Sequence, residues 1–176
     1  FLHMLTGSMP GQAEARALDA YLVTVCDHGL NASTFAARVV ASTRAGLVSA
    51  AVAGLSALKG PLHGGAPGPV LDMIDAIGVP ENAEVWIEGA LARGDRLMGF
   101  GHRVYRVRDP RADALKAAVV RLPGTSGRIA FAEHSERAVL GRLAQKYPHR
   151  RLEANVEFYT ALLLEALGLP REAFTP

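Results

Sequence analysis

Apolar residues recur at helical spacing along most of the chain, and no stretch of useful length alternates apolar and polar residues. The clearest helical stripe comprises Val70, Met73, Ile74 and Ile77. Its members are spaced i, i+3, i+4 and i+7, which places them on one face of a helix. Aromatic residues make up only 6% of the chain, too few for a typical β-sandwich. The sequence therefore predicts an all-α fold.

Glycines, prolines and helix-capping residues set the expected helix boundaries. Asp109 before a proline is a typical N-cap, Asn155 can cap the last helix, and Asn31 or Ser33 can cap an earlier one. The alanine-rich stretch 36–57 is typical of a buried central helix or a subunit interface, because small side chains let helix axes approach. The predicted helices are 11–27, 31–59 with a break at 42–46, 69–77, 83–93, 110–122, 129–147 and 156–167.

Composition excludes several classes of protein. The 176 residues are 20% charged with a net charge of +2, which argues against disorder and against the dense basic stripe of a nucleic-acid-binding protein. No apolar run is long enough to span a membrane. The single Cys26 excludes an internal disulfide, fits a reducing cytoplasm, and has a helix pattern around it that predicts a core thiol. Because the sequence opens at Phe1, we expect a fragment of a longer protein.

Two histidines flanked by glycines stand in predicted turns between helices. His63 lies in GPLHGG at 60–65, and His102 lies in GFGHRVY at 99–105. Glycine lets the backbone approach a ligand closely, and an imidazole can offer a ring nitrogen to a substrate oxygen. These histidines could equally cap helices or fix turns, and context alone leaves both interpretations open. Their spacing fits no zinc signature, so no metal site is predicted.

An acid and several basic side chains are further candidates. Glu157 falls in the first turn of a predicted helix, where a carboxylate also stabilises the helix dipole with no catalytic role. His28 follows a helix end and is either an ordinary last-turn residue or a donor to a substrate carboxylate. The basic run near His102 is either a solvated face or an anion site. It comprises Arg103, Arg106, Arg108 and Arg111.

Five segments, taken together, resemble the citrate synthase family in order and approximate spacing. They are DHGLNAST at 27–34, GPLHGGA at 60–66, GDRLMGFGHRVY at 94–105, DPR at 109–111 and NVEFY at 155–159. One such motif would be weak, whereas five in order over nearly the whole chain are highly specific. The resemblance implies a two-domain, all-helical homodimer or higher oligomer. Residues 1–63 would belong to the large domain, 64–167 would form the small domain, and 168–176 would return to the large domain.

The resemblance also implies a reaction, the condensation of acetyl-CoA with oxaloacetate to citrate and CoA. His63 would hydrogen-bond the thioester oxygen, Glu157 would remove the α-proton, and His102 would contact the oxaloacetate carbonyl. Oxaloacetate would be bound by His28, Asn31 and Arg111. The CoA thioester, a co-substrate rather than a resident cofactor, would lie near Gly99, Phe100, Gly101 and Arg103.

Two departures from the family pattern bear on these expectations. The usual base is aspartate, whereas Glu157 is one methylene longer, which affects rate and acyl preference more than reaction type. The sequence also ends at Pro176, before a further helix and substrate-binding arginines of the family, so we expect this piece alone to be inactive. Two other functions stay open: a 2-methylcitrate synthase that uses propionyl-CoA, and a non-catalytic relative that binds acyl-CoA. A zinc hydrolase is a distant third.

Overall fold

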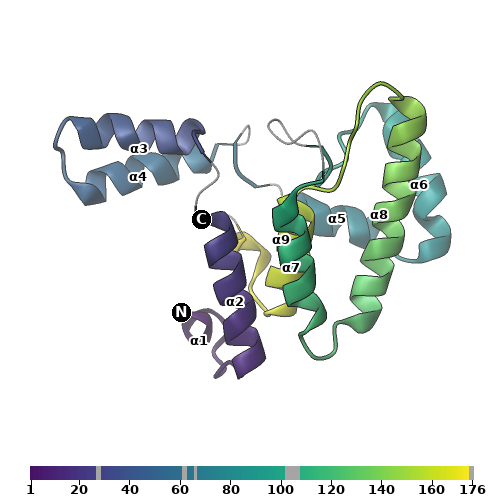
Figure 1. Cartoon of the computed structure of the whole chain (residues 1–176), viewed down its shortest axis with the longest axis horizontal. Helices are drawn as coiled ribbons and strands as arrows, with labels where there is room; N and C mark the ends of the chain where they lie inside the picture. The colour runs from purple at the N-terminus through teal and green to yellow at the C-terminus, as the bar shows by residue number, and fades with distance from the viewer. Residues whose placement is uncertain (27–28, 61–62, 66, 102–107, 175–176) are drawn as a thin grey trace.

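The computed structural model describes residues 1–26, 29–60, 63–65, 67–101 and 108–174. Within these ranges the chain is helical (Figure 1), and extended backbone pairs only at an isolated antiparallel bridge between Phe100 and Ala154. The all-α prediction is confirmed. Every helix of the described part is too short or too polar to cross a membrane. The elements are α1 (Leu2–Thr6), α2 (Gln12–Val25), α3 (Ala32–Ser42), α4 (Leu47–Leu58), α5 (Pro67–Ile77), η1 (Pro80–Asn82), α6 (Ala83–Arg93), α7 (Pro110–Val120), α8 (Ser126–Lys146), α9 (Val156–Ala166) and η2 (Arg171–Ala173).

Local sequence signals place most helix boundaries where they were expected. The side chains of Asn31, Asp109 and Asn155 each accept a hydrogen bond from a backbone N–H in the first turn of α3, α7 and α9. The expected break before α4 is present, with positive φ angles of 62° at Arg44 and 92° at Gly46. These caps and breaks act within a few residues, which is why the sequence alone predicts them.

Three expectations about local structure were wrong. Helix α8 begins at Ser126, three residues before the predicted start at 129, because its first residues, 126–128, carry no apolar side chain from which the helical periodicity could be read. Helix α5 begins at Pro67, two residues before the predicted start at Pro69. The first N–H groups of a helix have no partner within it, so prolines at both positions cost no hydrogen bond. Cys26 is exposed rather than in the core, because it lies just beyond the end of α2.

Helix α9 lies at the centre of the core. It packs against α7 and α5, while α2 packs on α7 and α6 on α8 (Figure 1). Burying a leucine or phenylalanine side chain contributes about 1.5–3 kcal/mol, so α9 is the main source of apolar stabilisation. Its buried residues are Val156, Phe158, Tyr159, Thr160, Ala161, Leu162, Leu163 and Leu164.

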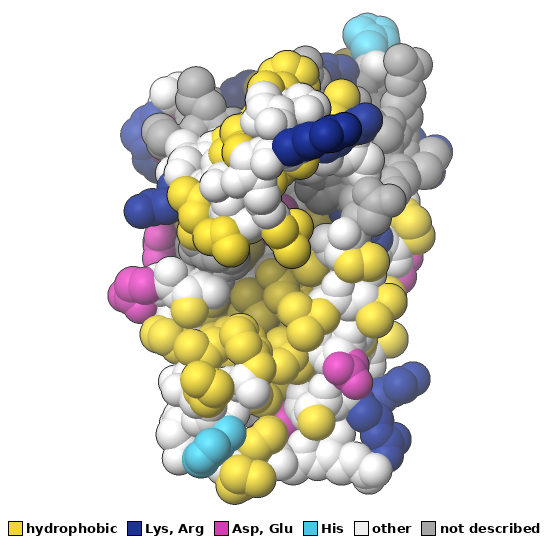
Figure 2. All heavy atoms as spheres, turned by 90° about the vertical axis from the view of Figure 1, so that its left-hand side faces the viewer, with side chains coloured by type: hydrophobic (Ala, Val, Ile, Leu, Met, Phe, Trp, Pro, Cys, Tyr) yellow, Lys and Arg dark blue, Asp and Glu magenta, His cyan; other side chains and the backbone are white. Residues whose placement is uncertain are grey.

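Helices α3 and α4 form an antiparallel hairpin that extends away from the other helices (Figure 1). They pack closely, because a Cβ at Gly54 would lie 3.3 Å from the Cβ of Ala37. On these two helices only Ala50 is buried. Figure 2 views the molecule from this end and shows apolar side chains on the protruding hairpin and, more densely, on the surface below it. On the hairpin, Leu47 is 87% exposed. The hairpin therefore leaves unburied an apolar surface that includes Phe35, Val39, Leu47, Val48, Val52 and Leu55.

Candidate active site

His63, shortly after α4, is held by the first turn of α3. The backbone N–H of Ser33 donates to His63 Nε2 at 3.1 Å, and Ser33 Oγ lies 2.9 Å from the same nitrogen. Asn31 Oδ1 lies 2.7 Å from Ser33 Oγ and also accepts from the backbone N–H of Thr34. Because a backbone N–H can only donate, Nε2 must accept, and a neutral imidazole then carries its proton on Nδ1. The ring is thus prepared to donate a hydrogen bond from Nδ1.

The backbone at 99–101 lies beside 153–155, at the start of α9. The N–H of Gly101 donates to the Glu153 carbonyl at 2.7 Å, and the N–H of Asn155 donates to the Gly99 carbonyl at 2.9 Å. The Asn155 side chain donates to the Gly101 carbonyl at 2.8 Å. At Gly99, φ is +85° and a Cβ would lie 3.0 Å from Val70 Cγ2, so this approach requires glycine. The segment expected to contact CoA is thereby fixed next to α9.

Asp109 joins the starts of two helices. Its carboxylate is buried, and Oδ1 accepts from the backbone N–H of Arg111 at 3.0 Å, which caps α7. Oδ2 accepts from the backbone N–H of Val156, the first residue of α9, at 3.1 Å. The Arg111 guanidinium also donates to the two oxygens, through Nε at 3.0 Å and Nη2 at 2.9 Å. The start of α7, which carries Arg111, is therefore tied directly to the start of α9.

The Asp109 carboxyl is an anion at neutral pH despite its position. Burial on its own would raise its pKa. The hydrogen bonds and charge of Arg111, together with the backbone N–H of Val156, outweigh burial and hold the pKa below its usual value of 3.8. This two-point, charge-assisted contact fixes the plane of the Arg111 guanidinium.

Glu157 is the second residue of α9 and is half-buried. Its backbone N–H donates to the Asn155 side chain at 3.0 Å, so the same asparagine caps α9 and holds the 99–101 segment. Burial and, to a lesser degree, the negative charge of Glu157 raise the pKa of Tyr21 on α2. The carboxylate therefore lies within electrostatic reach of α2.

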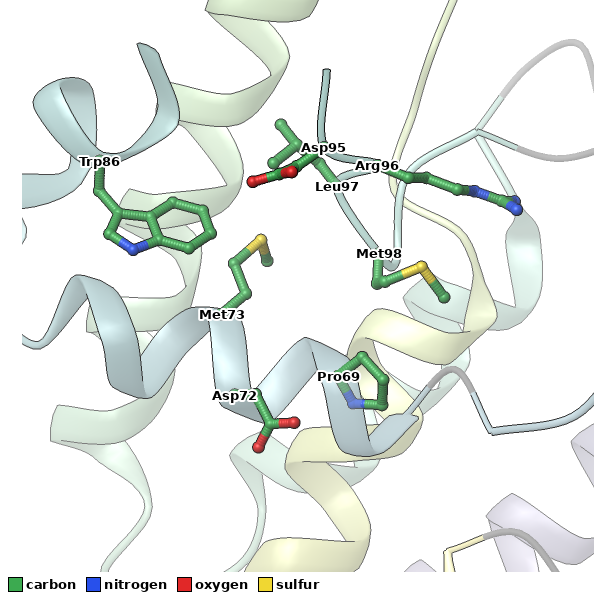
Figure 3. A pocket seen from close by; sticks show the side chains of 8 residues that line it. All are labelled: Pro69, Asp72, Met73, Trp86, Asp95, Arg96, Leu97 and Met98. Carbon is green, nitrogen blue, oxygen red and sulfur yellow. The ribbon is translucent and has the colours of Figure 1, made fainter. Parts of the chain in front are cut away.

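A hollow of about 270 Å³ lies next to the segment 99–101. Figure 3 shows the Trp86 indole on one side and Met98 on the other, with Met73 between them. Asp72, Asp95 and Arg96 also line it, so the apolar side chains are bordered by charges of both signs. Met98 directly precedes Gly99, so the hollow opens next to the expected CoA segment.

The predicted site residues fall into two clusters in the described structure. Glu157, Arg111 and the segment 99–101 with Phe100 lie around the start of α9, joined by the hydrogen bonds of Asp109 and Asn155. His63 and Asn31 meet at Ser33, at the end of the hairpin nearest the other helices (Figure 1). Outside the described residues lie His28, His102 and Arg103. Convergence of the histidines on Glu157 stays a prediction.

Ser33 is a site residue whose contact the sequence did not predict, since only a capping role was expected for it. The available signal was its position in the first turn of a helix, where backbone N–H groups lack helical partners and can serve another acceptor. No metal-binding group of three or more His, Cys, Asp or Glu side chains occurs among the described residues.

The chain is similar in sequence to proteins of known family. A family model described as citrate synthase, C-terminal domain, matches residues 1–176. The chain belongs to the citrate synthase family. The family resemblance inferred from five motifs is confirmed, and the all-helical architecture agrees with it.

Relatives in the citrate synthase family include enzymes named for two reactions. The putative citrate synthase 2 of Mycobacterium tuberculosis is 46% identical over 161 residues, covering 92% of this chain and 43% of that protein. A 2-methylcitrate synthase of the same species is 49% identical over 123 residues, covering 69% of this chain and 31% of that protein.

Among solved structures, the Thermoplasma acidophilum citrate synthase in a ternary complex with carboxymethyl coenzyme A and oxaloacetate has a TM-score of 0.83 and is 30% identical. The similarity covers 97% of this chain and 45% of that one. The chain thus spans less than half the length of each of these citrate synthase family members.

Proposed function

We propose that the complete protein containing this chain condenses acetyl-CoA with oxaloacetate to form citrate and CoA, the entry step of the tricarboxylic acid cycle. The observation that carries the proposal is the Ser33 N–H donating to His63 Nε2 at 3.1 Å. It leaves the Nδ1 proton available to the oxygen of a thioester, where negative charge develops when the α-proton is removed. Membership of the citrate synthase family supports the same chemistry.

In this proposal Glu157 removes the α-proton. That proton is far less acidic than a carboxylic acid, so Glu157 depends on the His63 hydrogen bond to the thioester oxygen. One such donor contributes about 10²–10³ in rate, and a positioned general base contributes about 10²–10⁴. Glutamate in place of the usual aspartate does the same chemistry with a longer reach. Glu157 is only half-buried, unlike its neighbours Val156 and Phe158, which are buried in the core.

Oxaloacetate is the proposed partner of the enol. Arg111, held in plane by Asp109, would bind one carboxylate, together with His28 and Asn31. The enol carbon attacks the keto carbon, and His102 supplies a proton to the oxygen of that carbonyl. Water then hydrolyses the thioester and releases citrate and CoA. Holding both substrates face to face contributes much of the remaining rate enhancement.

The CoA portion is proposed to follow the segment 99–101 and Arg103. Carbonyl and N–H groups of that segment are already paired with 153–155, so the strand-like backbone is rigid where a ligand would approach. The hollow at Trp86 and Met98 offers an adjoining apolar wall. Closure of the large domain (1–63 and 168–176 here) over the small domain (64–167) would exclude water during enolisation.

We also propose a cytoplasmic homodimer in which the α3–α4 hairpin is covered by the partner subunit. The hairpin buries little more than Ala50 within this chain and exposes valine, leucine and phenylalanine side chains. Contiguous exposed apolar surface of this kind is typical of an interface.

Assays of the complete protein with two thioesters test the proposed substrate. We expect a higher kcat/KM with acetyl-CoA than with propionyl-CoA. A propionyl preference would instead identify a 2-methylcitrate synthase, which the 49% identity to such an enzyme keeps as the second candidate. A single methylene changes selectivity by only about 1–3 kcal/mol, so both assays are needed.

Replacement of His102 tests whether the protein is a catalyst at all. His102→Ala is expected to abolish condensation with little loss of thermal stability, because the imidazole acts on substrate. A variant with near-normal kcat would remove His102 from the mechanism. CoA binding by the wild-type protein without product formation would instead identify a non-catalytic relative.

A further inference from the structure

Helix α8 carries a buried carboxylate to which the proposed mechanism gives no part. Glu136 is only 5% exposed, although glutamate is rarely buried unless it is paired. Its Oε2 accepts from the hydroxyl of the fully buried Tyr159 at 2.6 Å, and its Oε1 accepts from Arg108 Nη1 at 2.8 Å. The Glu136 side chain thus connects α8 to Tyr159 on α9 and to Arg108, the residue before the N-cap of α7.

The two partners of Glu136 lie beside residues of the proposed site. Arg108 directly precedes Asp109, and Tyr159 lies on α9 two positions after Glu157. Asp109 bonds directly to the first N–H of α9, and Arg108 is joined to the next turn of α9 through Glu136. Two consecutive residues at the start of α7 are therefore attached to α9 at two heights. These two polar attachments add directional contacts to the apolar packing of α7 against α9.

The remaining contacts of this network hold its members in place. Arg108 Nε donates to Asp113 Oδ1 at 2.6 Å, which binds the guanidinium to the first turn of α7. The Lys116 ammonium lies 5.6 Å from the centre of the Tyr159 ring. Burial and the Glu136 anion raise the pKa of the Tyr159 hydroxyl, so it remains a hydrogen-bond donor at neutral pH.

Stability alone is a weak reason for such a network. Replacing a buried ion pair by well-packed apolar residues is often neutral or stabilising, because the charges lose their hydration on folding. The charged groups instead define the relative geometry of the helices, since each hydrogen bond fixes both a distance and an angle between its partners. We propose that Glu136 is a positioning residue that sets Arg111, on α7, relative to Glu157, on α9. This inference rests on the proposed function, because these are the groups assigned to oxaloacetate and to the α-proton.

Glu136→Gln in the complete protein tests the inference. Glutamine keeps the size but removes the negative charge and one acceptor, so the contact to Arg108 is no longer charge-assisted at both partners and the hydrogen bond with the Tyr159 hydroxyl must reverse its direction. A misplacement of about 1 Å in a site can cost about 10²-fold in rate. We expect kcat for condensation to fall at least tenfold. KM for oxaloacetate should change less than threefold, because Asp109 still holds Arg111.

A second contact variant, its combination with Glu136→Gln and a control variant make the result specific. Tyr159→Phe removes only one contact and is expected to lower kcat in the same way, and Glu136→Gln combined with Tyr159→Phe should lose little more than the worse single variant. The matched control is Glu88→Gln, an exposed glutamate of α6 that pairs with Arg142 of α8 at 2.7 Å. It should keep kcat within twofold of the wild type.

The possible outcomes separate this inference from the proposed function. Unchanged kcat in both Glu136→Gln and Tyr159→Phe, with an active wild type, would overturn the positioning role alone. Lower thermal stability with unchanged kcat would also overturn it. If Glu136→Gln fails to fold, the kcat of Tyr159→Phe decides. A wild type that forms no product with either thioester refutes the proposed function, and this inference with it.

Discussion

The α3–α4 hairpin and the body formed by α2 and α5–α9 are both helical, but they bury their apolar residues very differently. In the body, α9 is buried along most of its length between α5 and α7. In the hairpin, α3 has no buried residue and α4 has only Ala50. The same kind of sequence, rich in alanine, valine and leucine, thus gives a buried helix in one region and an exposed apolar surface in the other.

The proposed site draws on both regions. His63 is fixed at the inner end of the hairpin by Ser33, and Glu157 is fixed in the body by Asn155 and the α9 helix. The region with fewer buried residues therefore orients His63, the group proposed to stabilise the enol.

The largest expected effect comes from removing one proposed catalytic group from each region. His63→Ala and Glu157→Gln should each slow deuterium exchange at the α-carbon of acetyl-CoA by about 10²–10⁴, because both groups are proposed to act in the same proton transfer. Exchange is followed by mass spectrometry with the complete protein. His134→Ala, at an exposed histidine of α8, serves as the control. Persistent exchange in either variant would remove that region from the site.

Matched leucine truncations test the difference in burial. Leu162→Ala on α9, where the side chain is 2% exposed, should lower the free energy of unfolding by about 2–5 kcal/mol at any protein concentration. Leu47→Ala on the hairpin, where it is 87% exposed, should have a smaller effect that depends on protein concentration. Urea titrations of the complete protein at two concentrations measure both. Equal, concentration-independent losses would contradict the distinction between the regions.

Asp109→Asn tests the polar contact that joins helices within the body. The pKa of Asp109 is lower in the folded protein than its usual 3.8, so its ionised form adds stability above that pH. This contribution is lost as the pH falls through the folded value. We expect Asp109→Asn to cost about 1–3 kcal/mol at neutral pH and to flatten the acid side of the stability profile.

The exposed Asp113 on the same helix provides the comparison for Asp109. Its side chain is 57% exposed, so Asp113→Asn should change the free energy of unfolding at neutral pH by less than about 1 kcal/mol. Thermal melts of both variants from neutral to acidic pH are the measurement. An Asp109→Asn profile parallel to that of the wild type would show that the carboxylate adds no ionisation-dependent stability.

The smallest expected effect concerns the proposed subunit interface at the hairpin. Val52 and Val120 are both 55% exposed, on the hairpin and on α7 respectively. Val52→Glu should raise the dimer dissociation constant at least tenfold, or about 1.4 kcal/mol, whereas Val120→Glu should not. Sedimentation of the complete protein measures both. Equal dissociation constants would mean that the hairpin is not the subunit interface.

Local signals were sufficient for most of the helices and insufficient for most of the contacts. Asn31, Asp109 and Asn155 cap helices as predicted, because each acts on N–H groups two or three residues away. Cys26 was misplaced, since helical periodicity tells which residues share a face but not whether another element covers that face. The contacts from Ser33 to His63 and from Glu136 to Arg108 and Tyr159 join residues more than twenty positions apart, for which the sequence held no spacing rule.

The sequence by itself determined the all-helical architecture, the family and the identity of the chemically capable side chains. It could do so because caps, breakers and motif order are properties of neighbouring residues. Only the tertiary structure decided which nitrogen of His63 accepts a hydrogen bond, and which buried anions hold α7 against α9. Those depend on the direction of hydrogen bonds between distant segments, and that direction exists only once the helices have packed.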